Sequence, residues 1–365
     1  VFLLTSHPIA PPWNSGDKNL ARTLLLGSSG VDYVFIGDRS DYTPWPEQHR
    51  RVALGFTSDA PTVRQKLRLL WWLVRSRPAA EMVHAVVTFR SVMAQRAVMH
   101  ATAIERMPLV LTCPSGAALP VPLIRRARAV VALSERTASA LCRAGAPLVR
   151  VIPPGVDLVR FRPESTVAAR GVLGVAHRPT ILFAGHHDPG GGLEAALTTA
   201  ARLRRGIPEL QVLLAMRLRP GEVLARQQAA VDRWSAQLGL AGTVVQLGPY
   251  ANMRAALHAS DVVIFQPATM GAKMELPMTL LEALACGRPV VTSKAAPLPE
   301  IADGSAAVFV GDSGAAATDD HVSALLTDRA AHTEAAAAAR ALAERRFAAG
   351  EMVTAYADLY ADLAA

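Results

Sequence analysis

The chain has 365 residues, of which 51% are hydrophobic, and a formal net charge of +8. This length exceeds one ordinary hydrophobic core and predicts two domains. Apolar runs such as 129–133 are too short to cross a bilayer, and residues 1–5 lack the charged leader of a signal peptide and predict a buried strand. Three cysteines without metal-ligand spacing argue against a disulfide framework and for a reducing compartment. We therefore expect a cytoplasmic protein.

Positive charge is concentrated in the first half. Residues 1–150 hold 19 Lys and Arg against 9 Asp and Glu, a net of +10, whereas the remainder holds 19 against 21, a net of −2. This asymmetry indicates either an anionic partner or a solvated basic surface. Within this half, 64–77 combines leucines and tryptophans at helical spacing with five basic residues. It predicts either a basic amphipathic helix on an anionic membrane or an ordinary helix packed on a sheet.

The first half otherwise predicts strands that alternate with helices. The expected strands are 1–5, 31–37, 82–87, 108–112 and 129–134. A loop that ends in Asn14-Ser15-Gly16-Asp17 leads from the first strand into a leucine-rich helix. Ser134 suits the N-cap of a further helix, and we expect His84 to be a hydrogen-bonded histidine at a strand end. Few aromatic residues and no readout motif argue against a nucleic-acid partner.

The run 151–163 contains three prolines and Gly155, which stiffen and turn a chain between two sheets. We place the domain boundary there, with a first domain of 1–155 and a second of 156–345. The second domain predicts strands at 180–185, 212–215, 244–247, 261–265, 290–291 and 307–310.

A glycine-rich loop follows the first strand of the second domain. It contains His186, His187 and the three glycines 190–192. Glycines leave backbone N–H groups bare, so that they can form a nest for an anion. His186 or His187 in a cationic state, or Arg217 after the next strand, can add positive charge.

The segment 273–291 predicts a loop, a helix, a turn and a strand. Pro277 suits the first helical position and Gly287 the left-handed stop. The free N–H groups of Met278, Thr279 and Leu280 would form an anion site that suits a phosphate. Glu282, further along, can accept hydrogen bonds from a ribose diol, as acids do in dinucleotide sites. These features predict a nucleotide-linked ligand; the alternative is that Glu282 is an ordinary surface glutamate.

Two stretches resemble a known family, the retaining glycosyltransferases of family 4 (glycosyl transferases group 1), which have the GT-B fold. They are 282–291, with its Gly-Arg-Pro-Val-Val end, and 151–163, with Ile-Pro and Gly-Val-Asp. The resemblance is strong from about 129 to 310. It implies an α/β protein with two Rossmann-like doubly wound domains facing a cleft: 1–155 for the acceptor, 156–345 for the nucleotide sugar. It also implies that a terminal helix, 346–365, returns to the first domain.

The sequence departs from the family pattern at positions that serve the donor. Met274 stands where the family has the first of two glutamates, and Glu275 lies one residue later. Pro114 replaces a histidine that lies near the reacting sugar, and His186 replaces an arginine that binds the diphosphate. The position of a diphosphate-binding lysine falls within the glycines 190–192.

The resemblance implies transfer of a hexosyl-type sugar, with retention, from a nucleotide-diphosphate donor to a lipid, polysaccharide or secondary metabolite. A UDP-sugar is the first choice of donor, and no metal or other cofactor is expected. At the catalytic centre we expect Glu275, His186 and Lys273. For donor binding we expect Gly16, Gly185, Gly190, Gly191, Arg217, Gly248, Met278, Thr279, Leu280 and Glu282.

The departures from the family pattern support an alternative, a non-catalytic homologue that binds a sugar nucleotide or acts as a partner subunit. The base, the sugar, the acceptor and the oligomeric state stay open. Contact with an anionic membrane at its inner face, through 64–77, is a further hypothesis.

Overall fold

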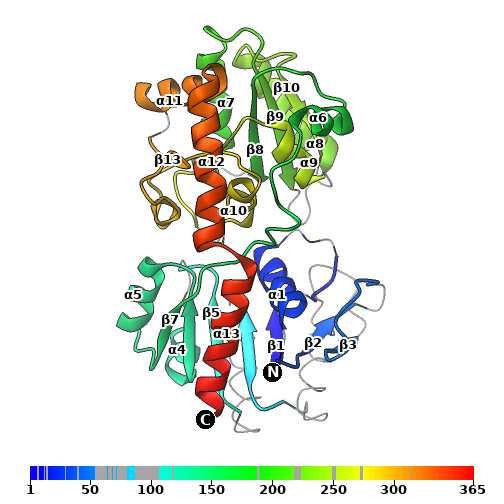
Figure 1. Ribbon diagram of the computed structural model, residues 1–365, viewed down its shortest axis with the longest axis vertical. Coiled ribbons are helices and arrows are strands. Elements are labelled where there is room, and N and C mark those ends of the chain that lie inside the picture. The colour runs from blue at the N-terminus through cyan, green and yellow to red at the C-terminus, as the bar shows by residue number, and fades with distance from the viewer. Residues whose placement is uncertain are drawn as a thin grey trace. The chain divides into compact units, whose positions relative to one another are not determined.

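The computed structural model describes residues 1–365 except 6–7, 12, 14, 29, 39–40, 54–63, 65–67, 69–70, 72–79, 87–106, 117–118, 187–189, 218–222, 249–251, 272–273 and 313. It contains two units, each with its own sheet (Figure 1). The first unit comprises Val1–Gly155, Gly271–Pro277 and Ala349–Ala365, and the second comprises Val156–Met270 and Met278–Ala348. The sequence assigned 271–277 to the second domain and 346–348 to the terminal helix; both assignments are wrong.

The first unit is a parallel sheet of seven strands in the order β3-β2-β1-β4-β5-β6-β7. The strands are β1 Phe2–Thr5, β2 Val34–Gly37, β3 Arg50–Ala53, β4 Val83–Val86, β5 Leu109–Cys113, β6 Ala129–Ala132 and β7 Val149–Val151. The helices with described bounds are α1 Gly16–Gly27, α4 Val121–Arg126, α5 Glu135–Arg143 and α13 Ala349–Ala364. Because the chain proceeds from β1 to β2 and β3 on one side and from β4 to β7 on the other, the sheet is doubly wound.

Helices cover both faces of this sheet, which explains why its central strands are buried along their length. On one face, α4 and α5 contribute Leu123, Ile124 and Leu141 to a buried core. On the other face, α1 and α13 lie together (Figure 1) and pack Leu24 and Tyr356 against the strands. Ser134 caps α5 and accepts a hydrogen bond from the Thr137 N–H at 3.2 Å, as the sequence predicted.

A chain of buried polar side chains fixes α13 to the sheet. His84, in β4, is fully buried and shares hydrogen bonds with the Thr112 hydroxyl at 2.7 Å and the Tyr360 hydroxyl at 2.7 Å. The Thr112 hydroxyl in turn meets the Tyr356 hydroxyl at 2.9 Å. Each ring nitrogen of His84 therefore has a partner, as expected for a buried polar group. Burial lowers the pKa of His84 to about 3, and the positive N-terminus adds to the effect.

The lowered pKa of His84 predicts that the protein loses stability in acid. This pKa is about 3 in the folded chain against an ordinary 6.5. Between these values the unfolded chain binds a proton that the folded chain does not, so stability falls as the pH drops from 6.5 towards 3. The slope from one such group reaches about 1.4 kcal/mol per pH unit. Urea midpoints measured across this range test the prediction; a midpoint that is flat with pH would contradict it.

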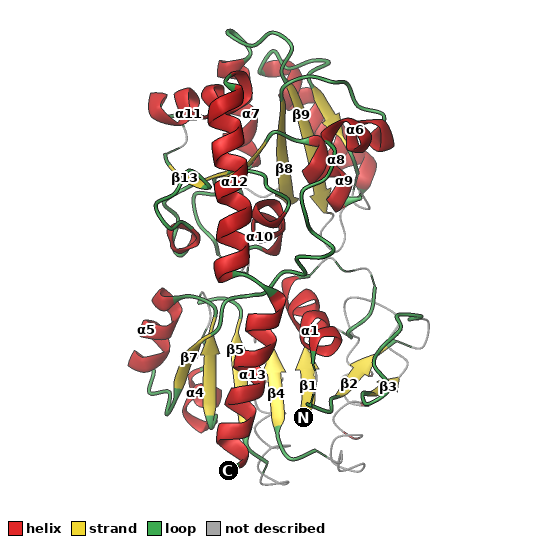
Figure 2. Cartoon of the chain, viewed as in Figure 1, coloured by secondary structure: helices red, strands yellow, loops and turns green. Residues whose placement is uncertain are grey.

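The second unit is a parallel sheet of six strands in the order β10-β9-β8-β11-β12-β13 (Figure 2). The strands are β8 Thr180–His186, β9 Gln211–Arg217, β10 Val244–Gln246, β11 Val262–Phe265, β12 Val290–Thr292 and β13 Val308–Val310. The helices are α6 Thr166–Leu173, α7 Leu193–Leu203, α8 Leu224–Gln237, α9 Met253–Ala259, α10 Met278–Ala285, α11 Ala316–Thr327 and α12 Arg329–Arg346, with a 3₁₀ turn at Leu298–Ile301. This sheet is also doubly wound, so the prediction of two Rossmann-like sheets is confirmed.

The segment around α10 follows the sequence prediction closely. The helix begins at Met278, directly after Pro277, rather than at the proline itself. It ends at Ala285, and Gly287, two residues later, has φ +68°, a conformation that favours glycine. The N–H of Gly287 bonds the Leu284 carbonyl at 2.9 Å, and the N–H of Arg288 bonds Ala283 at 2.8 Å. These bonds satisfy the last carbonyl groups of α10 before β12 begins.

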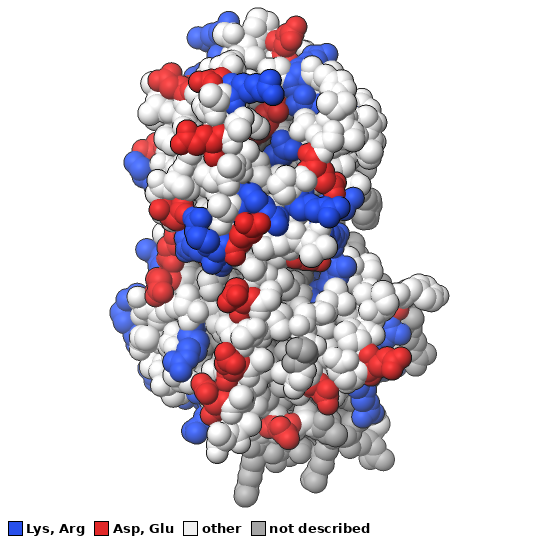
Figure 3. Space-filling view, in the orientation of Figure 1, with Lys and Arg blue, Asp and Glu red and all other residues white. Residues whose placement is uncertain are grey.

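The surface charge and the helices of the described residues can be compared with the anionic partner and the membrane contact considered from the sequence. On the face drawn in Figure 3, acidic and basic side chains lie side by side rather than in one basic field. No described helix combines the length and apolar character needed to cross a membrane. Of 64–77, the structure describes Arg64, Arg68 and Trp71, all exposed, and the rest of this segment lies outside the described residues.

Candidate donor site in the second unit

The carboxyl edge of the second sheet has the topology of a ligand site. The chain leaves β8 towards β9 on one side and returns through β11 on the other, so the connections diverge between these two strands. In open α/β sheets, ligands bind at such a switch point beyond the carboxyl ends of the strands. Most of the predicted donor-binding residues lie at this edge, on the strand ends or helix starts: Gly185, Gly190, Gly191, Arg217, Gly248, Met278, Thr279 and Leu280.

The glycine turn after β8 packs against the segment after β11. Gly192 has φ +99°, and a Cβ there would lie 3.2 Å from the Pro267 nitrogen and 3.3 Å from the Gln266 nitrogen, so a side chain would be both strained and tightly packed. The Ala268 N–H donates to the Gly190 carbonyl at 2.8 Å. Gly192 is also the residue before α7, so the turn presents the N-terminal end of that helix at the switch point. The positive end of a helix dipole favours an anion there.

Arg217 and His186 form a pair across neighbouring strands. They lie opposite each other in the register of β8 and β9, and Arg217 Nη2 is 2.6 Å from His186 Nε2. A guanidinium has donors only, so Nε2 accepts and the imidazole is neutral with its proton on Nδ1. The sequence considered His186 as a cation; in this arrangement Arg217 is the cation and His186 positions it.

The N-terminus of α10 is the second anion-binding feature of this edge. Met278 and Leu280 are buried, and Thr279 and Glu282 are partly exposed on the same short helix. The first N–H groups of a helix have no partner within it, so those of 278–280 are available to a ligand. Glu282 lies about one turn beyond them. A phosphate at the helix start and a ribose near Glu282 suit this spacing.

Gly248 follows β10 with φ +82°, and the residues after it, 249–251, lie outside the described residues. Gly185 precedes His186, and a Cβ at that position would approach the Phe183 ring to 2.9 Å. Lys273, predicted at the catalytic centre, also lies outside the described residues.

Glu275, by contrast, is buried within the first unit. The Ser134 hydroxyl donates to its Oε2 at 2.6 Å, the Thr137 hydroxyl donates to its Oε1, and its own N–H donates to the Pro114 carbonyl at 3.0 Å. Its carboxylate therefore lies at the N-terminus of α5, where the helix dipole favours a negative charge. The sequence placed Glu275 in catalysis. In the structure it is 3% exposed and holds Gly271–Pro277 on the first unit.

The position of the missing family histidine lies beside this anchor. Pro114 stands there, directly after Cys113 at the end of β5. Burial, and then the charge of Glu275, raise the pKa of the Cys113 thiol to about 12. The thiol is therefore neutral at ordinary pH and does not replace the histidine as a base or nucleophile.

Gly16, the donor-binding candidate of the first unit, begins α1. A Cβ on Gly16 would collide with the side chain of Met274. Met274 packs at the margin of the apolar core formed with α1 and α13. An apolar contact thus occupies the position where the family has its first glutamate.

Comparison with known proteins finds a family match for much of the second unit. Residues 178–328 match the family described as Glycosyl transferases group 1. This part of the chain is therefore similar to the group 1 glycosyl transferases. The match contains the glycine turn, the Arg217–His186 pair and α10, and it confirms the resemblance drawn from the sequence.

Curated relatives share this part of the chain. A D-inositol 3-phosphate glycosyltransferase of Saccharomonospora viridis is 34% identical over 161 residues, which cover 42% of this chain and 36% of the relative. The protein of the same name from Rhodococcus jostii is 30% identical over 238 residues, or 61% of this chain and 48% of the relative. The chain thus spans half or less of the length of these relatives.

Solved structures resemble the chain over nearly its whole length. HepE from Anabaena, in complex with UDP and glucose, has a TM-score of 0.78 at 20% identity, and the likeness covers 99% of each chain. Sucrose-phosphate synthase from Thermosynechococcus elongatus has a TM-score of 0.79 at 17% identity, over 99% of this chain and 98% of its own. These likenesses confirm the GT-B fold that the sequence implied.

Proposed function

We propose that this chain is a glycosyltransferase that moves a sugar from a nucleotide-diphosphate donor to an acceptor. The observation that carries the proposal is the convergence of three groups at the switch point of the second sheet: the glycine turn before α7, the Arg217–His186 pair and the N-terminus of α10. Each of the three groups favours an anion, and together they suit an anion with more than one phosphate. Glu282 supplies an acceptor for the ribose hydroxyls of the same ligand.

Arg217 takes the part of the family arginine whose position His186 occupies. A guanidinium can donate two hydrogen bonds to one phosphate, and the contact with His186 restricts its orientation. As the sugar leaves, negative charge grows on the diphosphate, and donors already in place stabilise it. The backbone N–H groups of the glycine turn substitute for the absent lysine. Retention of configuration and the absence of a metal requirement follow from the family resemblance and are part of the proposal.

Glu282 provides a direct test of ligand orientation. We expect Glu282→Ala to weaken binding of a nucleoside diphosphate roughly tenfold or more, because a hydrogen bond to a charged acceptor contributes about 1.5–3 kcal/mol. Titration calorimetry with UDP, and with analogues of UDP that lack the ribose, measures this loss of affinity. An equal loss for ligands with and without the ribose would contradict the role given to Glu282.

A second candidate is a non-catalytic homologue that binds a sugar nucleotide as a partner subunit. Pro114 in place of a histidine, and His186 in place of an arginine, favour it. Incubation with UDP-glucose and other nucleotide sugars separates the two. Release of the nucleoside diphosphate, above the rate in Arg217→Ala, supports the enzyme, whereas binding without release supports the partner subunit.

The acceptor is proposed only as a class. The curated relatives are named for D-inositol 3-phosphate, which makes a phosphorylated polyol a first acceptor to test beside lipids, polysaccharides and secondary metabolites. We propose that the first unit binds the acceptor. We also propose that the protein is cytoplasmic and contacts an anionic membrane through 64–77.

A further inference from the structure

The first unit contains a pocket at the amino ends of three strands. It has a volume of about 710 Å³ and is lined by residues that precede or begin β5, β6 and β7, by the end of α4 and by the end of α13. A volume of this size suits a small ligand. The carboxyl ends of the same strands, where ligands of open α/β sheets bind, are at the opposite edge. The pocket is therefore separate from the Glu275 anchor, and residues of the first unit alone line it.

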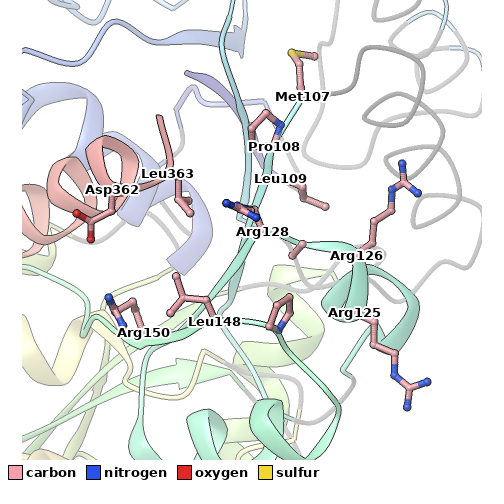
Figure 4. Close-up of a pocket in the computed structure, with 12 residues that line it drawn as sticks. Met107, Pro108, Leu109, Arg125, Arg126, Arg128, Leu148, Arg150, Asp362 and Leu363 are labelled. Atoms are coloured by element: carbon pink, nitrogen blue, oxygen red, sulfur yellow. The ribbon is translucent and has the colours of Figure 1, made fainter. Parts of the chain in front are cut away.

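Four arginines line this pocket, against one acidic residue, Asp362. Figure 4 shows Arg128 in the middle of the group, with Arg126 and Arg150 to either side and Arg125 turned away. Arg125 Nε donates to the Ala144 carbonyl at 3.1 Å, which accounts for its direction.

The other three arginines lack protein partners among the described residues. No hydrogen bond or ion pair joins the side chains of Arg126, Arg128 or Arg150 to another described side chain or carbonyl, and all three are exposed. Their backbones are nevertheless held. The Arg128 N–H bonds the Leu109 carbonyl at 2.7 Å, and Arg150 is paired with Val131 in the sheet. The backbone of Arg128 and of Arg150 is thus fixed at the pocket, and their guanidinium groups have no partner among the described residues.

Apolar side chains complete the lining. Leu109 from β5, Leu148 before β7 and Leu363 from α13 lie beside the arginines (Figure 4). Leu109 is 3% exposed and belongs to the buried core. An inorganic anion would use only the guanidinium groups. A ligand with both a phosphate and an apolar part would use both kinds of lining.

We propose that this pocket binds a phosphate ester with an apolar chain, through Arg128 and Arg150, at a site separate from the donor site. The same chemistry occurs in a free alkyl phosphate and in the headgroup of an acidic lipid within a membrane. In either case the ligand attaches to the amino edge of the first sheet and leaves the carboxyl edge open.

The test compares two double variants of the full chain that lose the same charge. Arg128→Gln/Arg150→Gln removes two lining guanidinium groups, and Arg50→Gln/Arg143→Gln removes two exposed arginines of the same unit that do not line the pocket. The probes are inorganic phosphate and octyl phosphate in titration calorimetry, and phosphatidylcholine vesicles with and without phosphatidic acid in flotation. Circular dichroism confirms that each variant folds.

We expect octyl phosphate to bind more tightly than inorganic phosphate, and binding to fall roughly tenfold or more (about 1.4 kcal/mol) in Arg128→Gln/Arg150→Gln. The control variant should bind as the unchanged chain does. Loss of vesicle flotation in the same variant identifies a membrane lipid as the source, and octyl phosphate binding without flotation identifies a free phosphate ester. If neither probe binds at millimolar concentration, or if both double variants lose binding equally, the proposal is wrong.

Discussion

Replacing Arg217 with alanine is expected to weaken binding of a nucleoside diphosphate by roughly ten- to a hundredfold. A charge-assisted hydrogen bond contributes about 1.5–3 kcal/mol, and about 1.4 kcal/mol corresponds to a factor of ten. Arg217 is a cation at the carboxyl edge of the second sheet, where it has a 2.6 Å contact with His186. Titration calorimetry with UDP, GDP, ADP and dTDP measures the effect.

Two further variants make this result specific. Arg205→Ala removes an exposed arginine just after α7, whose end lies at the opposite edge of the sheet, and should bind as the unchanged chain does. His186→Gln keeps an oxygen that can accept from Arg217, so its loss should be smaller than that of Arg217→Ala. Equal affinities for Arg217→Ala and Arg205→Ala would remove Arg217 from the site.

Replacing His84 with leucine is expected to destabilise the first unit by about 2–4 kcal/mol. The change leaves a buried hydroxyl of Thr112 and of Tyr360 short of one partner each, and each such group costs about 1–3 kcal/mol. Tyr356 and Tyr360 both belong to α13, so the loss should also loosen this helix. Urea unfolding gives the free energy, and hydrogen exchange of the α13 amides shows where it acts.

Tyr360→Phe is the matched variant, because it removes one hydroxyl and keeps the ring. It should cost about half as much as His84→Leu. His84→Leu should also weaken the dependence of stability on pH between 6.5 and 3, since it removes the group that gives rise to it. A change of less than about 0.5 kcal/mol, the range of ordinary surface substitutions, would mean that the network does not hold α13.

The sequence predicted the central strands of both sheets well and the edge strands of the first sheet poorly. β5 and β11 are buried along their length and lie within one residue of the predicted ranges. β3, at one edge, begins with exposed Arg50 and Arg51 and has no apolar run. β7, at the other edge, falls partly in the run taken for a linker. Helix α4 was missed because it starts among prolines, with Pro122 in its first turn.

Features of the site that depend on local chain geometry could be predicted, and those that depend on distant contacts could not. Gly287 and Ser134 carry signals within a few residues of the helix ends that they form. Glu275 accepts hydrogen bonds from Ser134 and Thr137, which lie more than 130 residues away in the sequence. No spacing in the sequence predicts these contacts. The contact of Arg217 with His186 depends on the register of β8 and β9, which the sequence leaves open.

The most direct test of the central claim is a thermal-shift titration of the full chain with UDP, GDP, ADP, dTDP and their sugar conjugates. We predict a rise in Tm for one base that grows with ligand concentration, because a ligand that binds only the folded chain stabilises it. The rise should be reduced in Glu282→Ala and Arg217→Ala and kept in Arg205→Ala. No shift with any of these ligands at millimolar concentration would contradict a nucleotide-sugar site in the second unit.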